Sequence, residues 1–254
     1  IGVGPSSSHT MGPWRAAQQF VQRCDQEGVF DRIERVQIDL YGSLAKTGRG
    51  HGTDLAVLLG LSNEDPVTCD TSLMHAKIDT IRNEARLFLG GRRSLPFVDE
   101  HDLRFHFDIT LPFHPNGLTF SAVLNDGQVY TETYYSIGGG FVTQENAAEA
   151  DHPLIELPFP IHTADELAAH CRATRLSIPE LVWQNELMWR SEAEINTTIS
   201  SLWNTMRDCV YRGCHAEGIL PGGLQVMRRA PSIHRKLLRS VEPTHSQQWI
   251  DIIT

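Results

Sequence analysis

The amino-terminal segment carries the densest group of side chains that could do chemistry. It reads Gly4-Pro5-Ser6-Ser7-Ser8-His9-Thr10, and a helical pattern begins at Pro13 directly after it. Hydroxyls, an imidazole and free backbone amides at the positive end of a helix are suited to bind a carboxylate or a phosphate. The alternative is an elaborate helix cap. Because the segment exceeds what one cap needs, we predict an anion-binding role for its polar residues Ser6, Ser7, Ser8 and His9.

A second candidate is His51, which lies in the glycine-rich segment 48–54. We interpret its glycines as a flexible turn that leads into a helix capped by Thr53 or Asp54. Histidine is the side chain best suited to accept a proton at neutral pH, and this one has little side-chain cover. The alternative is a histidine that merely shapes the turn.

A third glycine-rich turn follows the predicted strand that ends near Tyr135. It contains Ser136, Gly138, Gly139 and Gly140, and consecutive glycines indicate a special backbone shape. We expect the Ser136 hydroxyl to be exposed there, with a bare tight turn as the alternative. Three such loops in one domain favour recognition of a small, polar, anionic ligand, although they do not identify a reaction.

The elements that position these loops alternate between helix and strand. Apolar spacing predicts a helix from Pro13 to Gly28, a strand over 33–40, a helix from 53 or 54 onward, and a helix over 78–89 closed by Gly90-Gly91. Residues 103–109 alternate as a strand, and 118–124 is predicted to pair with 129–135 across a tight turn. The fold class is therefore α+β with a partly antiparallel sheet.

The second half of the chain has a helical pattern. Three helix starts carry capping boxes, which pair Thr163 with Glu166, Ser177 with Glu180 and Ser191 with Glu194. The last of these helices runs towards Gly213, residues 220–223 form a turn, and a basic helix follows around Ile233. A proline-rich stretch places a domain boundary near residues 151–162.

Composition excludes several classes of protein. The 254 residues carry 22 Lys and Arg against 31 Asp and Glu, a net charge of −9 that disfavours nucleic acid. The basic cluster in residues 228–239 is interpreted as a solvated helix face. No apolar run approaches the roughly 20 residues that a membrane helix needs. Five cysteines without a C-x-x-C pair indicate a reducing cytoplasm.

Four motifs, in residues 1–13, 41–44, 50–54 and 134–140, resemble in their order the iron-sulfur-dependent bacterial L-serine dehydratases, also called L-serine deaminases. In the second half, residues 184–186, 217–224 and 228–230 resemble the opening of that family's catalytic domain. The resemblance spans essentially the whole chain and points to the single-chain form of the enzyme.

The resemblance implies a serine dehydratase β domain over residues 1–155, similar to the allosteric substrate-binding domain of some 3-phosphoglycerate dehydrogenases. Residues 156–254 would begin a helical catalytic α domain. It implies conversion of L-serine to pyruvate and ammonia, with a [4Fe-4S] cluster as the Lewis acid on the serine hydroxyl. His51 would be the catalytic base. Substrate contacts would come from Ser6, Ser7, Ser8, His9, Thr53, Asp54, Ser136, Gly138 and Gly139. A cytoplasmic homodimer is expected.

One departure from the family pattern concerns the cluster ligands. The family's cluster cysteines and its Thr-Asn-Gly substrate loop lie later in the catalytic domain, so we expect the ligands to be absent from these residues. The chain would then be a portion of a longer enzyme and inactive alone. None of the five cysteines matches a cluster motif, and we expect all of them to be small buried apolar residues.

Two other functions are compatible with the residues. The first is an amino-acid-binding module that kept the ligand loops without the chemistry. The second is a serine hydrolase using Ser7 or Ser8 with His9 or His51 and Asp54, which lacks a G-x-S-x-G elbow or any other nucleophile signature.

Overall fold

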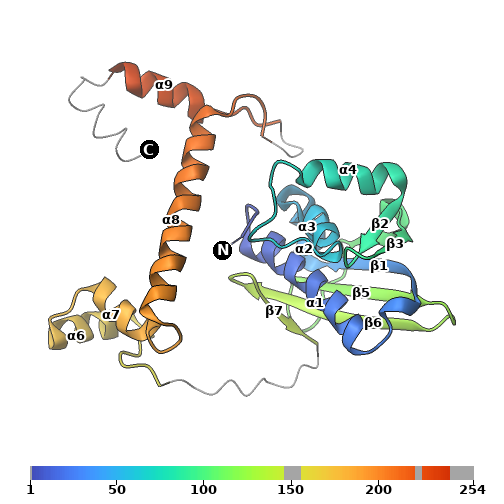
Figure 1. Ribbon diagram of the computed structural model, residues 1–254, viewed down its shortest axis with the longest axis horizontal. Coiled ribbons are helices and arrows are strands. Elements are labelled where there is room, and N and C mark those ends of the chain that lie inside the picture. Colours follow the sequence, from blue (N-terminus) through green and yellow to red (C-terminus); the bar gives the residue numbers. More distant parts are fainter. Residues whose placement is uncertain (1, 146–155, 221–224, 241–254) are drawn as a thin grey trace. The chain divides into compact units, whose positions relative to one another are not determined.

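The computed structural model describes residues 2–145, 156–220 and 225–240 (Figure 1). The chain divides into two compact units, Ile1–Glu149 and Ala150–Thr254. Part of the stretch where we predicted a domain boundary, and residues 221–223 of the predicted turn, lie outside the described residues.

A five-stranded sheet forms the centre of the N-terminal unit, with strand order β4-β1-β5-β6-β7. Its strands are β1 (Ile33–Tyr41), β4 (Leu103–His106), β5 (Gly117–Leu124), β6 (Val129–Gly138) and β7 (Phe141–Gln144). β1 and β4 are parallel, and the other pairs are antiparallel. β5 and β6 pair across the tight turn, as the sequence predicts. The α+β class with a partly antiparallel sheet is confirmed.

Helices cover one face of this sheet. They are α1 (Gly12–Gln26), α2 (Gly42–His51), α3 (Thr53–Leu61) and α4 (Met74–Glu84). The unit also contains a short π-helical turn η1 (Ser7–Met11), the turn η2 (Phe30–Arg32) and the short helix α5 (Asp99–Asp102). α1 packs on β6 and beside α3. Trp14 and Phe20 of α1 are fully buried. Trp14 Nε1 donates to the Glu64 carbonyl at 2.7 Å, and Phe20 stacks on Phe120 of β5 at 5.0 Å between ring centroids.

Two predicted elements have different bounds. The helix expected to close at Gly90 ends at Glu84, and β2 (Arg86–Leu89) follows and pairs with β3 (Arg93–Pro96). Leu87 and Leu89 are buried while Phe88 between them is exposed, which is the alternation of a strand. The strand expected over 103–109 ends at His106.

The described part of the C-terminal unit is helical. It contains α6 (Ala164–Thr174), α7 (Ile178–Glu186), α8 (Glu192–His215) and α9 (Ala230–Ser240). The capping boxes predicted at Thr163, Ser177 and Ser191 are all present. Capping boxes are readable from sequence because both of their hydrogen bonds join residues three apart.

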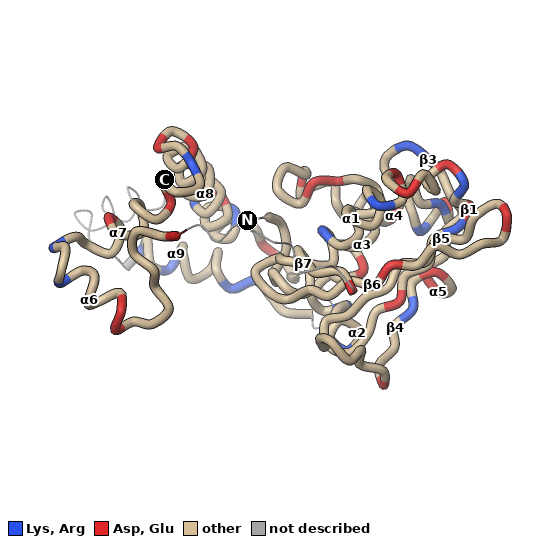
Figure 2. The backbone as a smooth tube through the Cα atoms, turned by 90° about the horizontal axis from the view of Figure 1, so that it is seen from below, with Lys and Arg blue, Asp and Glu red and all other residues tan. Residues whose placement is uncertain are grey.

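Acidic and basic residues are interleaved along the backbone of the N-terminal unit (Figure 2). Arg82, for example, pairs with both Asp54 and Asp99. In the part of the chain that the structure describes, no helix is long and apolar enough to cross a membrane.

Candidate functional site

The serine-rich segment is itself the start of a helix. The Ser6 side chain accepts a hydrogen bond from the His9 amide at 3.2 Å and so caps η1, which runs directly into α1. The first amides of such a turn, at Ser7 and Ser8, have no acceptor within it. Ser7 is exposed, and Ser8 is partly exposed. The segment is therefore both a helix cap and a helix N-terminus with free amides. The cap interpretation and the anion-binding interpretation of this sequence are compatible.

A sharp turn between β1 and α2 brings Ser43 to His9. Gly42 has φ +51°, and a Cβ there would lie 2.4 Å from the Pro115 carbonyl oxygen. Glycine is therefore required for the chain to turn directly from strand to helix. Ser43, one residue later, places its Oγ 2.9 Å from His9 Nε2.

His51 lies at the end of a helix, not in the flexible turn that we expected. α2 continues through Gly48 and Gly50 and stops at Gly52, whose φ of +67° is left-handed. Gly48 is buried against Thr53, so tertiary packing offsets the low helix propensity of glycine. The expected cap is also different, because Gly52 occupies the N-cap of α3 and no side chain caps it.

The two histidine rings of the site face each other. Their centroids are 5.0 Å apart. His9 Nδ1 lies 2.9 Å from Ser8 Oγ, so both nitrogens of this ring have hydroxyl partners. His51 Nδ1 lies 2.9 Å from the Thr47 carbonyl oxygen. A carbonyl can only accept, so Nδ1 carries the hydrogen and the Nε2 of neutral His51 has a free lone pair.

The surroundings of His9 disfavour the charged form of its ring. Burial lowers the pKa of His9, the nearby His51 lowers it further, and the hydrogen bond with Ser43 partly opposes both. The arrangement places the His51 ring, with Nε2 available, beside a second ring that serine hydroxyls hold in place.

The structure corrects the prediction for Ser136. We expected an exposed hydroxyl, but Ser136 is fully buried on the inner face of β6. A Cβ on Gly12 would lie 1.9 Å from Ser136 Oγ, so α1 begins directly against this side chain. In this conformation Ser136 supports the start of α1, and its hydroxyl cannot contact a ligand.

The glycines after Ser136 form the turn between β6 and β7. Gly138 and Gly139 have positive φ values of +99° and +60°, and both are at least partly exposed. Gly140 packs on Met11, and its carbonyl accepts a hydrogen bond of 3.0 Å from Arg15 Nη1. The turn is thereby held beside the first residues of α1, near the serine-rich segment.

Thr53 and Asp54 form hydrogen bonds within the protein. Thr53 is fully buried, and its hydroxyl donates to the His9 carbonyl at 2.5 Å. Asp54 accepts from Arg82 Nη2 at 3.1 Å, which links α3 to α4. Asp54 is paired with Arg82, and the His51 imidazole binds the Thr47 carbonyl. Within the described residues the Ser-His-Asp arrangement of a hydrolase with His51 is therefore not formed.

The described residues do not fit an iron-sulfur cluster. Such clusters are held mainly by cysteine thiolates, and no three His, Cys, Asp or Glu side chains gather into a metal site within the described ranges. The five cysteines are unpaired, and the expectation that all of them are buried is wrong. Cys24, on the buried side of α1, is buried, whereas Cys209 is exposed.

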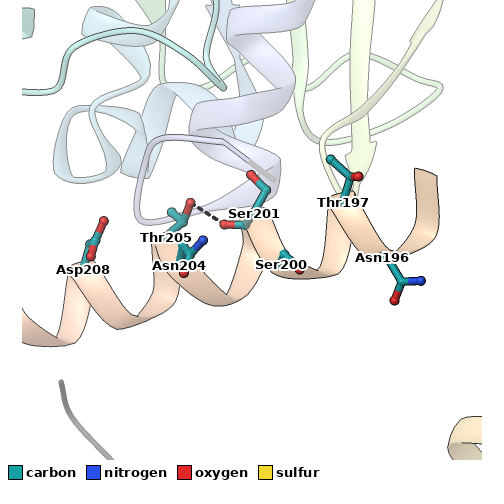
Figure 3. A pocket seen from close by; sticks show the side chains of 7 residues that line it. All are labelled: Asn196, Thr197, Ser200, Ser201, Asn204, Thr205 and Asp208. Carbon is teal, nitrogen blue, oxygen red and sulfur yellow. Dashed lines mark hydrogen bonds between the residues drawn. The ribbon is translucent and has the colours of Figure 1, made fainter. Parts of the chain in front are cut away.

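A separate hollow lies on α8 (Figure 3). Seven polar residues of one helix face line it, and the Thr205 hydroxyl donates to the Ser201 carbonyl of the same helix at 2.9 Å. The full set is Asn196, Thr197, Ser200, Ser201, Asn204, Thr205 and Asp208. Because one helix supplies all of these groups and none is a histidine or a cysteine, the hollow lacks the proton-transfer groups of the N-terminal site.

Sequence reasoning missed three contributors to the site. Ser43 binds His9, the Thr47 carbonyl fixes the His51 tautomer, and Thr10 donates to the His51 carbonyl at 2.8 Å. A serine directly after a glycine at a strand-to-helix junction was the available signal for Ser43. The other two contacts join residues brought together by folding or by the unexpected extension of α2.

The chain matches two family models and several curated proteins over nearly its whole length. Residues 1–147 match "Serine dehydratase beta chain", and residues 173–252 match "Serine dehydratase alpha chain". The chain is 44% identical to an L-serine dehydratase of Streptomyces coelicolor over 257 residues, which are 99% of this chain and 56% of that protein. It is 40% identical to L-serine dehydratase 1 of Escherichia coli over 99% of this chain and 57% of that protein. It thus spans about half the length of these relatives.

Proposed function

This chain belongs to the serine dehydratase family, and on that premise we propose that its N-terminal unit supplies the proton acceptor and part of the substrate-binding surface of an L-serine dehydratase. L-serine would be the substrate, and pyruvate and ammonia the products. The names of the relatives support the substrate, and the geometry around His51 supports the role of this unit.

The proposal rests on the hydrogen bond that fixes the tautomer of His51. Its Nδ1–H donates to the Thr47 carbonyl, so the ring is oriented and Nε2 can take a proton. The ring stands at the end of α2 and is partly exposed, so a ligand can reach it. A histidine held through one nitrogen, with the other nitrogen free, is the arrangement expected of a general base.

The proposed elimination needs one base. His51 Nε2 accepts the proton from the α carbon of serine, and the electrons of that C–H bond form the double bond to the β carbon. The C–O bond to the β carbon breaks with its electron pair on the oxygen, and the leaving hydroxyl takes a proton from solvent to become water, while His51 returns its own proton to solvent. The resulting aminoacrylate tautomerises to an imine, which takes up water and releases ammonia and pyruvate. Because the described residues do not fit a cluster, we derive no step through one.

The exposed start of η1 would bind the substrate carboxylate. Its free amides at Ser7 and Ser8, together with the exposed Ser7 hydroxyl, lie at the positive end of a continuous helical segment, while the Ser8 hydroxyl is bound to His9 Nδ1. Ser6 and His9 hold this turn in shape, and Gly138 and Gly139 lie on the adjoining turn. Thr53, Asp54 and Ser136 then act behind this surface rather than on the substrate.

The direct test replaces His51 by asparagine in a polypeptide of the relatives' full length that carries this sequence. The asparagine amide can still donate to the Thr47 carbonyl, but it offers no basic nitrogen at the position of Nε2. We expect kcat for pyruvate formation to fall by roughly two to four orders of magnitude, the effect of losing a positioned base.

The matched control is His75→Asn. His75 is exposed on α4, and within the described residues it makes no hydrogen bond to a residue of the site. We expect its kcat to stay within about twofold of the parent. If His51→Asn, with equal folded content, keeps kcat within about tenfold of the parent, His51 is not the base.

Three further proposals concern the domains, the assembly and the location of the protein. We propose that residues 1–155 are the β domain and 156–254 part of the α domain, which limited proteolysis between the units would test. We also propose a homodimer, measurable by light scattering of the full-length protein. A cytoplasmic location is proposed from the cysteine pattern and is testable by cell fractionation.

A further inference from the structure

Two threonine hydroxyls form hydrogen bonds between η1 and the junction of α2 and α3. Thr10 Oγ1 donates to the His51 carbonyl at 2.8 Å, and Thr53 Oγ1 donates to the His9 carbonyl at 2.5 Å. Each threonine lies one or two residues after one histidine and binds the backbone of the other. Thr10 is 3% exposed and Thr53 is fully buried. We call this pair of bonds the threonine latch.

Both carbonyls are available because the helical pattern is interrupted beside them. In an α-helix the His9 carbonyl would accept from the amide four residues later, but that residue is Pro13, which has no N–H. His51 is the last residue of α2, and the left-handed Gly52 directs the following chain away from the helix. The latch therefore satisfies two backbone acceptors that the local structure leaves without their usual donors.

The latch joins the two segments at the residues that carry the imidazoles. Each ring also has its own hydrogen-bond partners. His9 binds Ser8 and Ser43, and His51 binds the Thr47 carbonyl. Ser8 and Thr47 lie in the same segment as the ring they bind, whereas Ser43 lies on α2 and joins His9 across the two segments. Thr10 and Thr53 add two cross-segment bonds next to the rings, whose centroids lie 5.0 Å apart.

We propose that Thr10 and Thr53 are positioning residues that hold His9 and His51 at a fixed distance. The catalytic consequence rests on the proposed function, whereas the effect on ring geometry does not. Thr53 is thereby assigned to the support of the site rather than to substrate contact. Displacement of a catalytic group by about 1 Å can lower a rate about a hundredfold.

The test uses Thr10→Val and Thr53→Val, which keep the shape of the side chain and remove the donor. Thr10→Ser and Thr53→Ser keep the donor and serve as the conservative rescue. Thr80→Val is the matched control, because the Thr80 hydroxyl also donates to a backbone carbonyl, that of Ala76 at 2.9 Å, but within exposed α4.

Two measurements are made on each variant. Nuclear Overhauser contacts between the ring protons of His9 and His51 report their distance in the 254-residue chain. Steady-state kinetics in the full-length polypeptide report kcat and KM. We expect the valine variants to lose the inter-ring contacts and to lower kcat by about 10- to 100-fold with a smaller change in KM. The serine variants and Thr80→Val should keep the inter-ring contacts and stay within about threefold in kcat.

The outcomes separate the latch from the proposed function. Persistence of the inter-ring contacts in folded valine variants overturns the latch, whatever the kinetics show. Loss of the contacts with unchanged kcat overturns the positioning role, and His51→Asn then shows whether His51 is the base at all. If one valine variant does not fold, Thr10→Ala or Thr53→Ala removes the same donor without adding volume.

Discussion

Replacing Gly12 by alanine should separate α1 from β6, and the structure gives the size of the effect. A Cβ at position 12 would lie 1.9 Å from Ser136 Oγ and 2.7 Å from Ser136 Cβ. Carbon atoms in contact sit at about 3.5–4.0 Å, so the two elements must move apart by about 1 Å or more. Rotating the Ser136 hydroxyl away relieves the first contact but not the second. We expect a net loss of about 1–3 kcal/mol, the usual cost of inserting a methyl group into a packed interface.

Gly50→Ala is the matched control for this substitution. Gly50 lies in α2, is exposed, and has nothing within 4 Å of a built Cβ. Alanine should therefore stabilise α2 by about 0.5–1 kcal/mol through its higher helix propensity. The two substitutions are chemically identical, so the expected difference in stability of about 1.5–4 kcal/mol between them reflects mainly the α1–β6 contact.

Hydrogen exchange measured by mass spectrometry on peptides from α1 and β6 gives the local free energies of opening in the whole chain. A double-mutant cycle with Ser136 identifies the contact. Ser136→Ala should recover a small part of the loss in the Gly12→Ala background, and Ser136→Gly a larger part. If Gly12→Ala is as stable as Gly50→Ala, or if neither substitution of Ser136 changes its cost, the close approach of α1 to Ser136 is wrong.

Two further predictions concern ionisable groups. Burial lowers the pKa of His9 below its ordinary value of 6.5, and His51 adds to the shift, so the unfolded chain binds the proton more tightly than the folded one. Stability should therefore fall as the pH drops through about 6.5 towards the folded pKa, and His51→Asn should raise the pKa of His9 in an NMR titration. Burial, followed by the charges of Glu132 and Asp25, raises the pKa of Cys24 to about 12. At pH 8 iodoacetamide should thus label exposed Cys209 and leave Cys24 unmodified until the chain unfolds, as peptide mass spectrometry would show; rapid labelling of Cys24 in the folded chain would contradict its burial.

Local signals in the sequence predicted their elements well. The capping boxes at Thr163, Ser177 and Ser191 formed as expected because their bonding partners are three residues apart. The pairing of β5 with β6 followed from alternation on both sides of a tight turn. In each case the pattern lies within one short stretch of chain, so no knowledge of distant contacts was needed.

The glycines near His51 misled the prediction because their use depends on distant contacts. Gly48 is tolerated inside α2 because it lies against Thr53, while Gly52 ends the helix through its positive φ. Composition alone does not distinguish a glycine that permits close packing from one that breaks a helix. The burial of Ser136 likewise depends on distant contacts, because α1 covers the strand face that Ser136 shares with Glu132 and Tyr134.

A motif shared with a family does not separate residues that contact a ligand from residues that support them. Here burial and hydrogen bonding make that separation. Thr10 and Thr53 are buried, and their hydroxyls donate to backbone carbonyls. Ser7, in contrast, is exposed at the start of a helix, and His51 Nε2 has no hydrogen-bond partner among the described residues. A polar group that already has a partner inside the protein must break that bond before it can bind a substrate, which costs free energy. The groups available to a ligand are therefore the first residues of η1 and the His51 ring, and the other motif residues fix where those groups stand.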